Sequence, residues 1–263
     1  MDALHKILNT YEPISLEEMD SVMLMDRMDS KYVFRQDRLE AFLEQIKNSY
    51  RVLEVNGHRI SRYESIYFDT KSFDLYHLHH NDRSNRYKIR FRKYVESGLN
   101  FFEIKFKNNK GRTVKKRIMH PLMEETIRGN TEKFLHDRTH LTSDQLEAKL
   151  WINFFRITLV NRFSPERVTV DLHLNFRNNG TEKTIHNIVI AETKQEKSAR
   201  SEFVRLMKQN HIIEGSLSKY CYGISSLFTE LKNNNFKPQI KRFNKLIHAT
   251  STEFNKRNSR YCI

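Results

Sequence analysis

The chain has 263 residues, 38% of them hydrophobic, and its 18 Phe and 11 Tyr indicate a folded protein rather than a disordered one. Its formal net charge of +14 at pH 7 predicts a polyanionic partner, such as nucleic acid, an anionic membrane or polyphosphate. The chain has only two cysteines, Cys221 and Cys262, so no disulfide framework is expected. Residues 1–11 lack an apolar secretion signal and no apolar run is long enough to span a membrane, so we expect a soluble cytoplasmic protein.

The first part of the chain predicts short helices mixed with strands. In chain order, we expect helices over residues 4–8 and 16–25, a strand over 26–34, a helix that Asp37 opens and a strand over 58–70. The strand over residues 26–34 places Asp29 and Lys31 on one face. A loop with His77, His79 and His80 follows; these histidines lack the further ligands of a tetrahedral metal site and are interpreted as polar surface.

The stretch from Asn85 to Lys107 carries the strongest pattern. Its cations alternate with apolar residues in two runs, Arg86, Lys88, Arg90 and Arg92 in the first and Lys105 and Lys107, with Glu103, in the second. Side chains of a strand alternate between two faces, so a turn at residues 97–100 predicts a hairpin with one cationic face and one apolar face. A third strand over residues 112–118 is expected to pair back onto it. Either the charges simply face water, or their mutual repulsion is balanced by a bound anion.

The second half predicts helices first and then strands. In order, we expect helical pieces over residues 120–138, a helix over 144–157 with the stripe Leu146, Leu150, Trp151, Phe154 and Phe155, strands over 156–163, 167–176 and 184–194, and helices over 198–209 and 216–231. About eight strands joined by tight turns or single helices predict an α+β fold. In it, a closed antiparallel eight-stranded β-barrel has a charged interior that forms a tunnel, and the helices pack outside.

The charge distribution predicts a boundary near residue 232. Residues 232–263 contain eight basic residues against one acid, Glu253. This excess of seven positive charges is half of the net charge of the chain. We therefore expect a tunnel domain over residues 1–231 and a basic tail over residues 232–263. The tail is interpreted either as a helix that contacts an anionic membrane or a partner, or as a solvated segment.

No glycine-rich phosphate loop is present, so any phosphate must be held by side chains. The cations expected to line the tunnel are Lys31, Arg90, Arg92, Lys105, Lys115, Arg162, Arg167, Lys194 and Lys219. Four carboxylates lie on the same strands, namely Asp29, Glu103, Asp171 and Glu192. Glu192 is the predicted ligand of a divalent metal ion, because its strand is otherwise apolar and such ions need a carboxylate beside phosphate oxygens. These parts suit phosphoryl transfer.

Several motifs resemble the VTC domain, the polyphosphate polymerase domain of the vacuolar transporter chaperone complex, within the triphosphate tunnel metalloenzyme or CYTH-like superfamily. They are Lys31-Tyr32, Ser65 to Thr70, Arg86 to Arg92, Glu103 to Lys105, Arg167 to Asp171, Ala191 to Lys194 and Ser218 to Gly223, and the resemblance covers roughly residues 25–231. It implies that the tunnel moves the γ-phosphate of ATP onto polyphosphate with Mn²⁺ or Mg²⁺. Asp29 stands where members of the superfamily often carry Glu, which weakens a second metal site.

The resemblance also implies residue roles. The residues that would bind phosphates are Lys31, Arg90, Arg92, Lys105, Lys115, Arg162, Arg167 and Lys219. Glu192 would hold the metal, with Lys194 beside it, and Ser218 and Lys219 would open a helix that closes one mouth of the tunnel.

Three functions remain open from the sequence. The first is a polyphosphate polymerase, the second a tunnel triphosphatase that releases phosphate to water, and the third a module that binds polyphosphate or another polyanion without turnover. Proteins that read nucleic acids expose aromatic rings beside their basic residues. Here the aromatic residues are expected on the opposite face, so no nucleic-acid partner is predicted.

Overall fold

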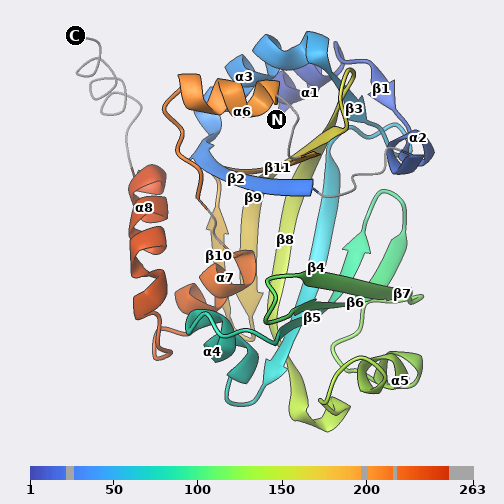
Figure 1. Ribbon diagram of the computed structural model, residues 1–263, viewed down its shortest axis with the longest axis vertical. Coiled ribbons are helices and arrows are strands. Elements are labelled where there is room, and N and C mark those ends of the chain that lie inside the picture. The colour runs from blue at the N-terminus through green and yellow to red at the C-terminus, as the bar shows by residue number, and fades with distance from the viewer. Residues whose placement is uncertain (22–26, 197–200, 216–217, 249–263) are drawn as a thin grey trace.

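The computed structural model describes residues 1–21, 27–196, 201–215 and 218–248, and one large β-sheet with helices around it dominates the fold (Figure 1). The strands are β1 (Pro13–Ile14), β2 (Arg27–Arg35), β3 (Tyr50–Leu53), β4 (Ser61–Thr70), β5 (Arg86–Tyr94), β6 (Leu99–Lys107), β7 (Thr113–Met119), β8 (Leu146–Asn161), β9 (Glu166–Asn178), β10 (Thr181–Ile185) and β11 (Ile188–Glu196). The helices are α1 (Asp2–Leu8), α2 (Leu16–Ser21), α3 (Leu39–Ile46), α4 (Asp74–His80), α5 (Asn130–His136), α6 (Glu202–Gln209), α7 (Lys219–Leu227) and α8 (Lys237–His248).

The sheet is antiparallel along its main path. Neighbouring strands are paired in the order β2-β11-β9-β8-β4-β5-β6-β7, while β3 pairs with β8 and β10 with β9. Strands β5 and β6 form the predicted hairpin, with Arg90 opposite Glu103. The α+β class and the antiparallel sheet are therefore confirmed.

The sheet is curved so strongly that distant strands face each other. Lys105 on β6 and Glu192 on β11 are five strand positions apart, about 24 Å in a flat sheet, because neighbouring strands lie about 4.8 Å apart. Glu192 and Lys194 of β11 nevertheless lie close enough to Lys105 to influence its pKa, which burial, Lys88 and Arg90 lower. Figure 1 shows the same bending, since β2 runs across the view and β8 runs along it. We call the concave side, which carries Lys105 and Glu192, the inner face.

The predicted closed eight-stranded barrel is wrong, because the pairing path has two ends. Within the described residues, β2 and β7 do not pair with each other. The second edge of β2 is contacted instead by the segment before α7, where the amide of Gly215 donates to the Lys31 carbonyl at 2.9 Å and Glu214 bridges to Tyr32. The described residues therefore form an open, curved sheet of eleven strands.

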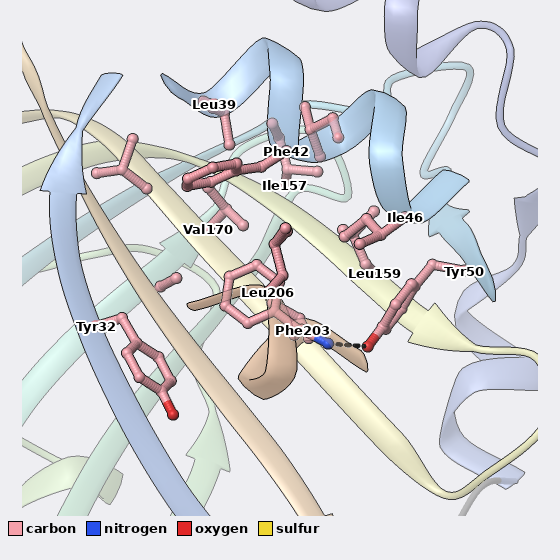
Figure 2. Packing of buried hydrophobic residues seen from close by; sticks show 14 of the residues in the cluster. Tyr32, Leu39, Phe42, Ile46, Tyr50, Ile157, Leu159, Val170, Phe203 and Leu206 are labelled. Atoms are coloured by element: carbon pink, nitrogen blue, oxygen red, sulfur yellow. Dashed lines mark hydrogen bonds between the residues drawn. The ribbon is translucent and has the colours of Figure 1, made fainter. Parts of the chain in front are cut away.

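Helices α1, α3 and α6 cover the outer face of β2, β11, β9 and β8 (Figures 1 and 2). Figure 2 shows the α3 cluster, in which Leu39, Phe42 and Ile46 of α3 pack with Ile157, Leu159 and Val170 of the sheet and with Phe203 and Leu206 of α6. The helix predicted to follow Asp37 is thus confirmed, and its buried residues form one apolar stripe. Tyr50 fixes the start of α6, because its hydroxyl oxygen accepts a hydrogen bond of 3.2 Å from the Phe203 amide.

The apolar face of the hairpin is buried as predicted. Ile89, Phe91, Phe102 and Ile104 point to the outer face and form the α5 cluster together with Leu135 of α5. These side chains are at most 3% exposed. The cationic side chains of β5 and β6 consequently point to the inner face.

One end of the inner face is filled by α7, which corrects the expectation that every helix packs outside. In this α7 cluster, Ile224 of α7 and Phe243 of α8 pack with Leu150 and Phe176 of the sheet. The contact with Gly223 is close, since a Cβ there would lie 2.6 Å from Leu150 Cδ2 and 2.7 Å from Phe176 Cδ1. No helix in the described part of the chain is long and apolar enough to span a bilayer.

Strand β8 replaces the helix predicted over residues 144–157. A bulge near Lys149 shifts its register against β4, so that Leu146 lies in the α5 cluster with Trp151, whereas Leu150 points inward. Such a bulge interrupts the period of two, and the remaining spacing of apolar residues resembles that of a helix. The predicted loop with three histidines is, conversely, helix α4.

Four apolar clusters support the sheet, and β8 contributes to each of them. The fourth, the α2 cluster, consists of Ile14, Met19, Leu53 and Val160. Among the described strands, β8 alone has residues in all four. It contributes Ile157 and Leu159 to the α3 cluster, Leu150, Ile152 and Phe154 to the α7 cluster, Leu146 and Trp151 to the α5 cluster, and Val160 to the α2 cluster.

Candidate functional site

The inner face beside the α7 cluster carries a dense set of charged side chains, which we call the basic cradle. Its cations are Lys31, Lys88, Arg90, Arg92, Lys105, Lys115, Arg156, Arg167, Lys194 and Lys219, and its acids are Asp29, Glu103, Asp171 and Glu192. They come from β2, β5, β6, β7, β8, β9, β11 and the first turn of α7. Ten cations stand against four acids here, so the cradle carries an excess of positive charge.

Glu103 holds two of these cations in place. Its side chain is 2% exposed, Arg90 Nε donates to it at 2.7 Å, and Lys115 forms an ion pair with its other oxygen. Burial alone would raise the pKa of Glu103, but Arg90, Arg92 and Lys115 lower it to about 2. Glu103 is therefore ionised at neutral pH and fixes the direction of Arg90.

Asp171 makes an equivalent contact on β9. Its carboxylate accepts hydrogen bonds from Arg156 Nε and Nη2 at 2.6 and 2.8 Å, and also one from Lys219. Burial opposes ionisation, yet Arg156 and Lys219 hold the pKa of Asp171 well below its ordinary value. Ser218 begins α7 as its N-cap and accepts from the Cys221 amide, which confirms that Ser218 and Lys219 open this helix.

Glu192 and Asp29 are the carboxylates best placed for a divalent cation. Lys194 forms an ion pair with Glu192 and lies 3.5 Å from Asp29 Oδ2, so both carboxylates converge on one positive charge. Burial would raise the pKa of Glu192, but Lys194 and Lys31 lower it to about 2.

These oxygen donors fit Mg²⁺ or Mn²⁺ bound together with a substrate. Such ions commonly take one or two carboxylates and complete their shell with phosphate oxygens and water. Within the residues that the structure describes, no group of three or more His, Cys, Asp and Glu side chains is arranged to hold a metal. The donor set therefore does not fit a cage made by protein side chains alone, and the metal role of Glu192 stays a prediction.

Three cations of the cradle lie on one wall, formed by β5 and β6, and have no carboxylate partner among the described residues. Arg92 Nε donates to Ser65 Oγ at 3.2 Å, and Lys88 Nζ donates to Ser218 Oγ at 2.9 Å. Burial and neighbouring cations lower the pKa of both. Burial, Lys88 and Arg90 likewise lower the pKa of Lys105 to about 8, while its side chain remains accessible to water. The uncompensated positive charge is thus concentrated on this wall.

Aromatic rings also lie on the inner face, which corrects the expectation that they all face outward. Tyr67 stacks on Tyr220 with the ring centroids 5.1 Å apart, and its hydroxyl accepts from Arg90 Nη1 at 2.6 Å. Burial would raise the pKa of Tyr67, but Arg90, Arg92 and Lys88 lower it to about 8. These rings are buried rather than exposed.

Most of the cations predicted from the sequence come together in the cradle, with one exception. Arg162 lies outside it, where its side chain forms an ion pair with Glu12 and its amide donates to the Ser49 carbonyl at 2.9 Å. Arg167 is directly opposite Lys194 and shares its face. All the others, including Lys31, Lys115 and Lys219, point to the inner face.

Two cradle residues were missed by the sequence analysis. Arg156 was overlooked because the segment around it was interpreted as the end of a helix and the start of a strand. Its alternation with Ile157 and Leu159, which are buried on the outer face, is the signal that identifies it. Lys88 shares the alternation of Arg90 and could have been included on that basis.

Comparison with known proteins identifies a family. The sequence matches the family described as VTC domain over residues 26–228. No curated protein matches the sequence. Similar solved structures include a proposed adenylate cyclase from Vibrio parahaemolyticus, with 15% identity, a TM-score of 0.46 and coverage of 77% of this chain and 99% of that one.

Two further structures have similar values. A proposed adenylate cyclase from Bacillus halodurans has 14% identity and a TM-score of 0.47, with 74% of this chain and 96% of that one covered. A proposed adenylyl cyclase from Hippeastrum, described as having a dominant triphosphatase activity, has 12% identity and a TM-score of 0.43, with coverage of 76% and 97%.

Proposed function

This chain belongs to the VTC domain family, and we propose that it is a metal-dependent polyphosphate polymerase that transfers the γ-phosphate of ATP to a growing polyphosphate chain. The observation that carries this proposal is the uncompensated charge of Lys88, Arg92 and Lys105 on one wall of the cradle. Like charges held this close repel one another, and a bound polyanion removes that repulsion. A linear chain of phosphates, with negative charge along its length, suits a cradle whose cations come from many strands.

The paired arginines would orient phosphate groups. A guanidinium has five N–H donors in a fixed plane, and it binds phosphate oxygens in a forked arrangement. Arg90 donates hydrogen bonds to Glu103 and Tyr67, and Arg156 donates two to Asp171. The remaining donors are free to meet phosphate oxygens in a direction that the carboxylates fix.

The reaction requires positioning and charge neutralisation rather than a protein nucleophile. The bond between the γ-phosphorus and the β,γ-bridging oxygen breaks, and the γ-phosphorus forms a bond to a terminal oxygen of the acceptor chain, which is already ionised. Lysine and arginine side chains of the cradle would stabilise the negative charge that develops on ADP. Glu192, with Asp29, would hold a divalent ion, which supplies further neutralisation of the transferred phosphate when bound.

Hydrolysis is the nearest competing activity, because the same cradle would hold a triphosphate while water replaces the acceptor chain. The decisive experiment incubates the purified protein with ATP and Mn²⁺ and separates the products on a polyacrylamide gel stained for polyphosphate. A ladder of long chains supports the polymerase. Free phosphate without a ladder shows a triphosphatase, and unchanged ATP shows a binding module.

A further inference from the structure

Two stacked aromatic rings lie against three cations of the basic cradle. Tyr63 of β4 and Phe154 of β8 have ring centroids 5.2 Å apart and planes inclined by 24°. The Arg156 guanidinium carbon lies 4.7 Å from the Tyr63 centroid and 5.2 Å from the Phe154 centroid, and that of Arg92 lies at 5.6 and 5.8 Å. Lys219 Nζ is 4.9 Å from the Phe154 centroid. One aromatic pair therefore contacts cations from three different elements.

An aromatic ring supports a cation differently from a carboxylate. The ring face attracts the positive charge electrostatically but carries no formal charge itself. A carboxylate that holds a cation also competes with phosphate for it, whereas a ring leaves the positive charge available. Arg92 illustrates this, because Ser65 and the two rings support it and no described carboxylate pairs with it.

The rings are also rigidly held. Phe154 is 3% exposed and Tyr63 is 8% exposed, and both belong to the α7 cluster. Tyr63 packs further against Tyr94, with centroids 4.9 Å apart. Side chains fixed in this way constrain the cations that lie on them, including two guanidinium groups that repel each other.

We propose that Tyr63 and Phe154 are positioning residues, which hold Arg92, Arg156 and Lys219 side by side so that they meet the oxygens of one phosphate chain. Neither ring touches the phosphates, and their action is through the three cations. This inference rests on the proposed function of the basic cradle and specifies how its cations are arranged.

The test compares variants that lose the ring with one that keeps it. Tripolyphosphate binding is measured by isothermal titration calorimetry without ATP, and thermal unfolding is measured in parallel. Tyr63→Leu and Phe154→Leu each remove one ring face, and we expect each to weaken tripolyphosphate binding about tenfold. Tyr63→Phe keeps the ring and loses only the hydroxyl, so it is expected to bind tripolyphosphate as tightly as the wild-type protein.

Phe243→Leu is the matched control for lost packing. Phe243 lies in the same apolar cluster, is 2% exposed and has no cradle cation over its ring. It should lower the unfolding temperature about as much as Phe154→Leu, since similar apolar volume is removed, while tripolyphosphate affinity stays within about twofold of wild type.

Three outcomes would overturn the inference. They are wild-type affinity in both leucine variants, Tyr63→Phe as weak as Tyr63→Leu, or an equal loss of affinity in Phe243→Leu. In these cases the wild-type protein still binds tripolyphosphate and the proposed function stands. If the wild-type protein itself binds no tripolyphosphate, the proposed function fails together with the inference.

Discussion

Arg156 and Asp171 are joined across the pairing of β8 and β9 by two charge-assisted hydrogen bonds of 2.6 and 2.8 Å, and the Asp171 side chain is 3% exposed. Because Lys219 donates to the same carboxylate, this pair also fixes the first residue of α7. A single buried acid thus orders two cations of the basic cradle, one from a strand and one from a helix.

Arg156→Gln is expected to lower turnover by about 100-fold or more, because a fixed cation in a buried site stabilises charge that develops during transfer. Turnover of ATP with Mn²⁺ is the measurement. Arg162→Gln serves as the control, since Arg162 forms a partly exposed pair with Glu12 and such pairs contribute at most about 1 kcal/mol to stability. Equal losses of activity in both variants would show that the set of residues assigned to the cradle is wrong.

Glu192→Gln is expected to reduce turnover by at least about 100-fold while the protein stays folded, because a bound divalent ion contributes several kcal/mol to charge stabilisation. Glu192, whose pKa is lowered to about 2, is ionised at neutral pH and would provide negative charge for the proposed metal ion. Mn²⁺ binding in the presence of tripolyphosphate, followed by electron paramagnetic resonance, should weaken in parallel. Full activity in this variant would count against the metal role of Glu192.

Phosphate binding near pH 8 is expected to take up protons. Burial and the neighbouring cations lower the pKa of Lys105 to about 8, so the free protein carries this group about half protonated at that pH. A bound polyanion favours the ammonium form and raises its pKa, which draws in a proton. Binding should accordingly weaken as the pH rises through 8.

Calorimetric titration with tripolyphosphate in buffers of different ionisation enthalpy measures this uptake. Lys105→Arg should reduce it, because arginine stays protonated. Tyr67, whose pKa is also about 8, should supply the remainder, and adding Tyr67→Phe should remove it. A binding enthalpy that does not depend on the buffer would contradict the assignment.

Gly223→Ala is expected to destabilise the protein although Ala favours helices. The new Cβ would lie 2.6 Å from Leu150 and 2.7 Å from Phe176, and such overpacking costs about 1–3 kcal/mol against a helix-propensity gain of about 1 kcal/mol. Helix α7 would shift and loosen Lys219 from Asp171, so tripolyphosphate affinity should fall too.

Urea unfolding and calorimetry measure the two effects of Gly223→Ala. Gly57→Ala is the control, because Gly57 has a φ of +77° and a Cβ added there would meet no atom within 4 Å. It should lower stability through backbone strain without changing phosphate affinity. A more stable Gly223→Ala protein would show that α7 does not pack as closely as described.

The sequence predicts the hairpin and its charged face well, because Arg90 and Arg92 alternate with buried Ile89 and Phe91 without interruption. It fails where a bulge breaks that alternation. Near Lys149 an extra residue on β8 changes which side chains point inward, and no residue type marks the position.

The second bulge has a larger effect on the site. The register of β8 and β9 shifts between Asn153 and Phe155, and His173, at a φ of +48°, lies in the corresponding part of β9. Val170 therefore packs in the α3 cluster and Leu174 in the α7 cluster, although the sequence places both in one alternating series. The sequence also does not show whether the sheet closes into a barrel, because that depends on the edge of β2 and on contacts between residues far apart in the chain.

Because β8 contributes to all four apolar clusters, no part of the sheet has a separate interior of its own. A change that loosens one cluster also destabilises β8, which the other three clusters share, so it is expected to destabilise the whole sheet. The amides at the middle of β8 should consequently exchange with solvent only when the whole molecule unfolds, and denaturation should be a single, all-or-none event.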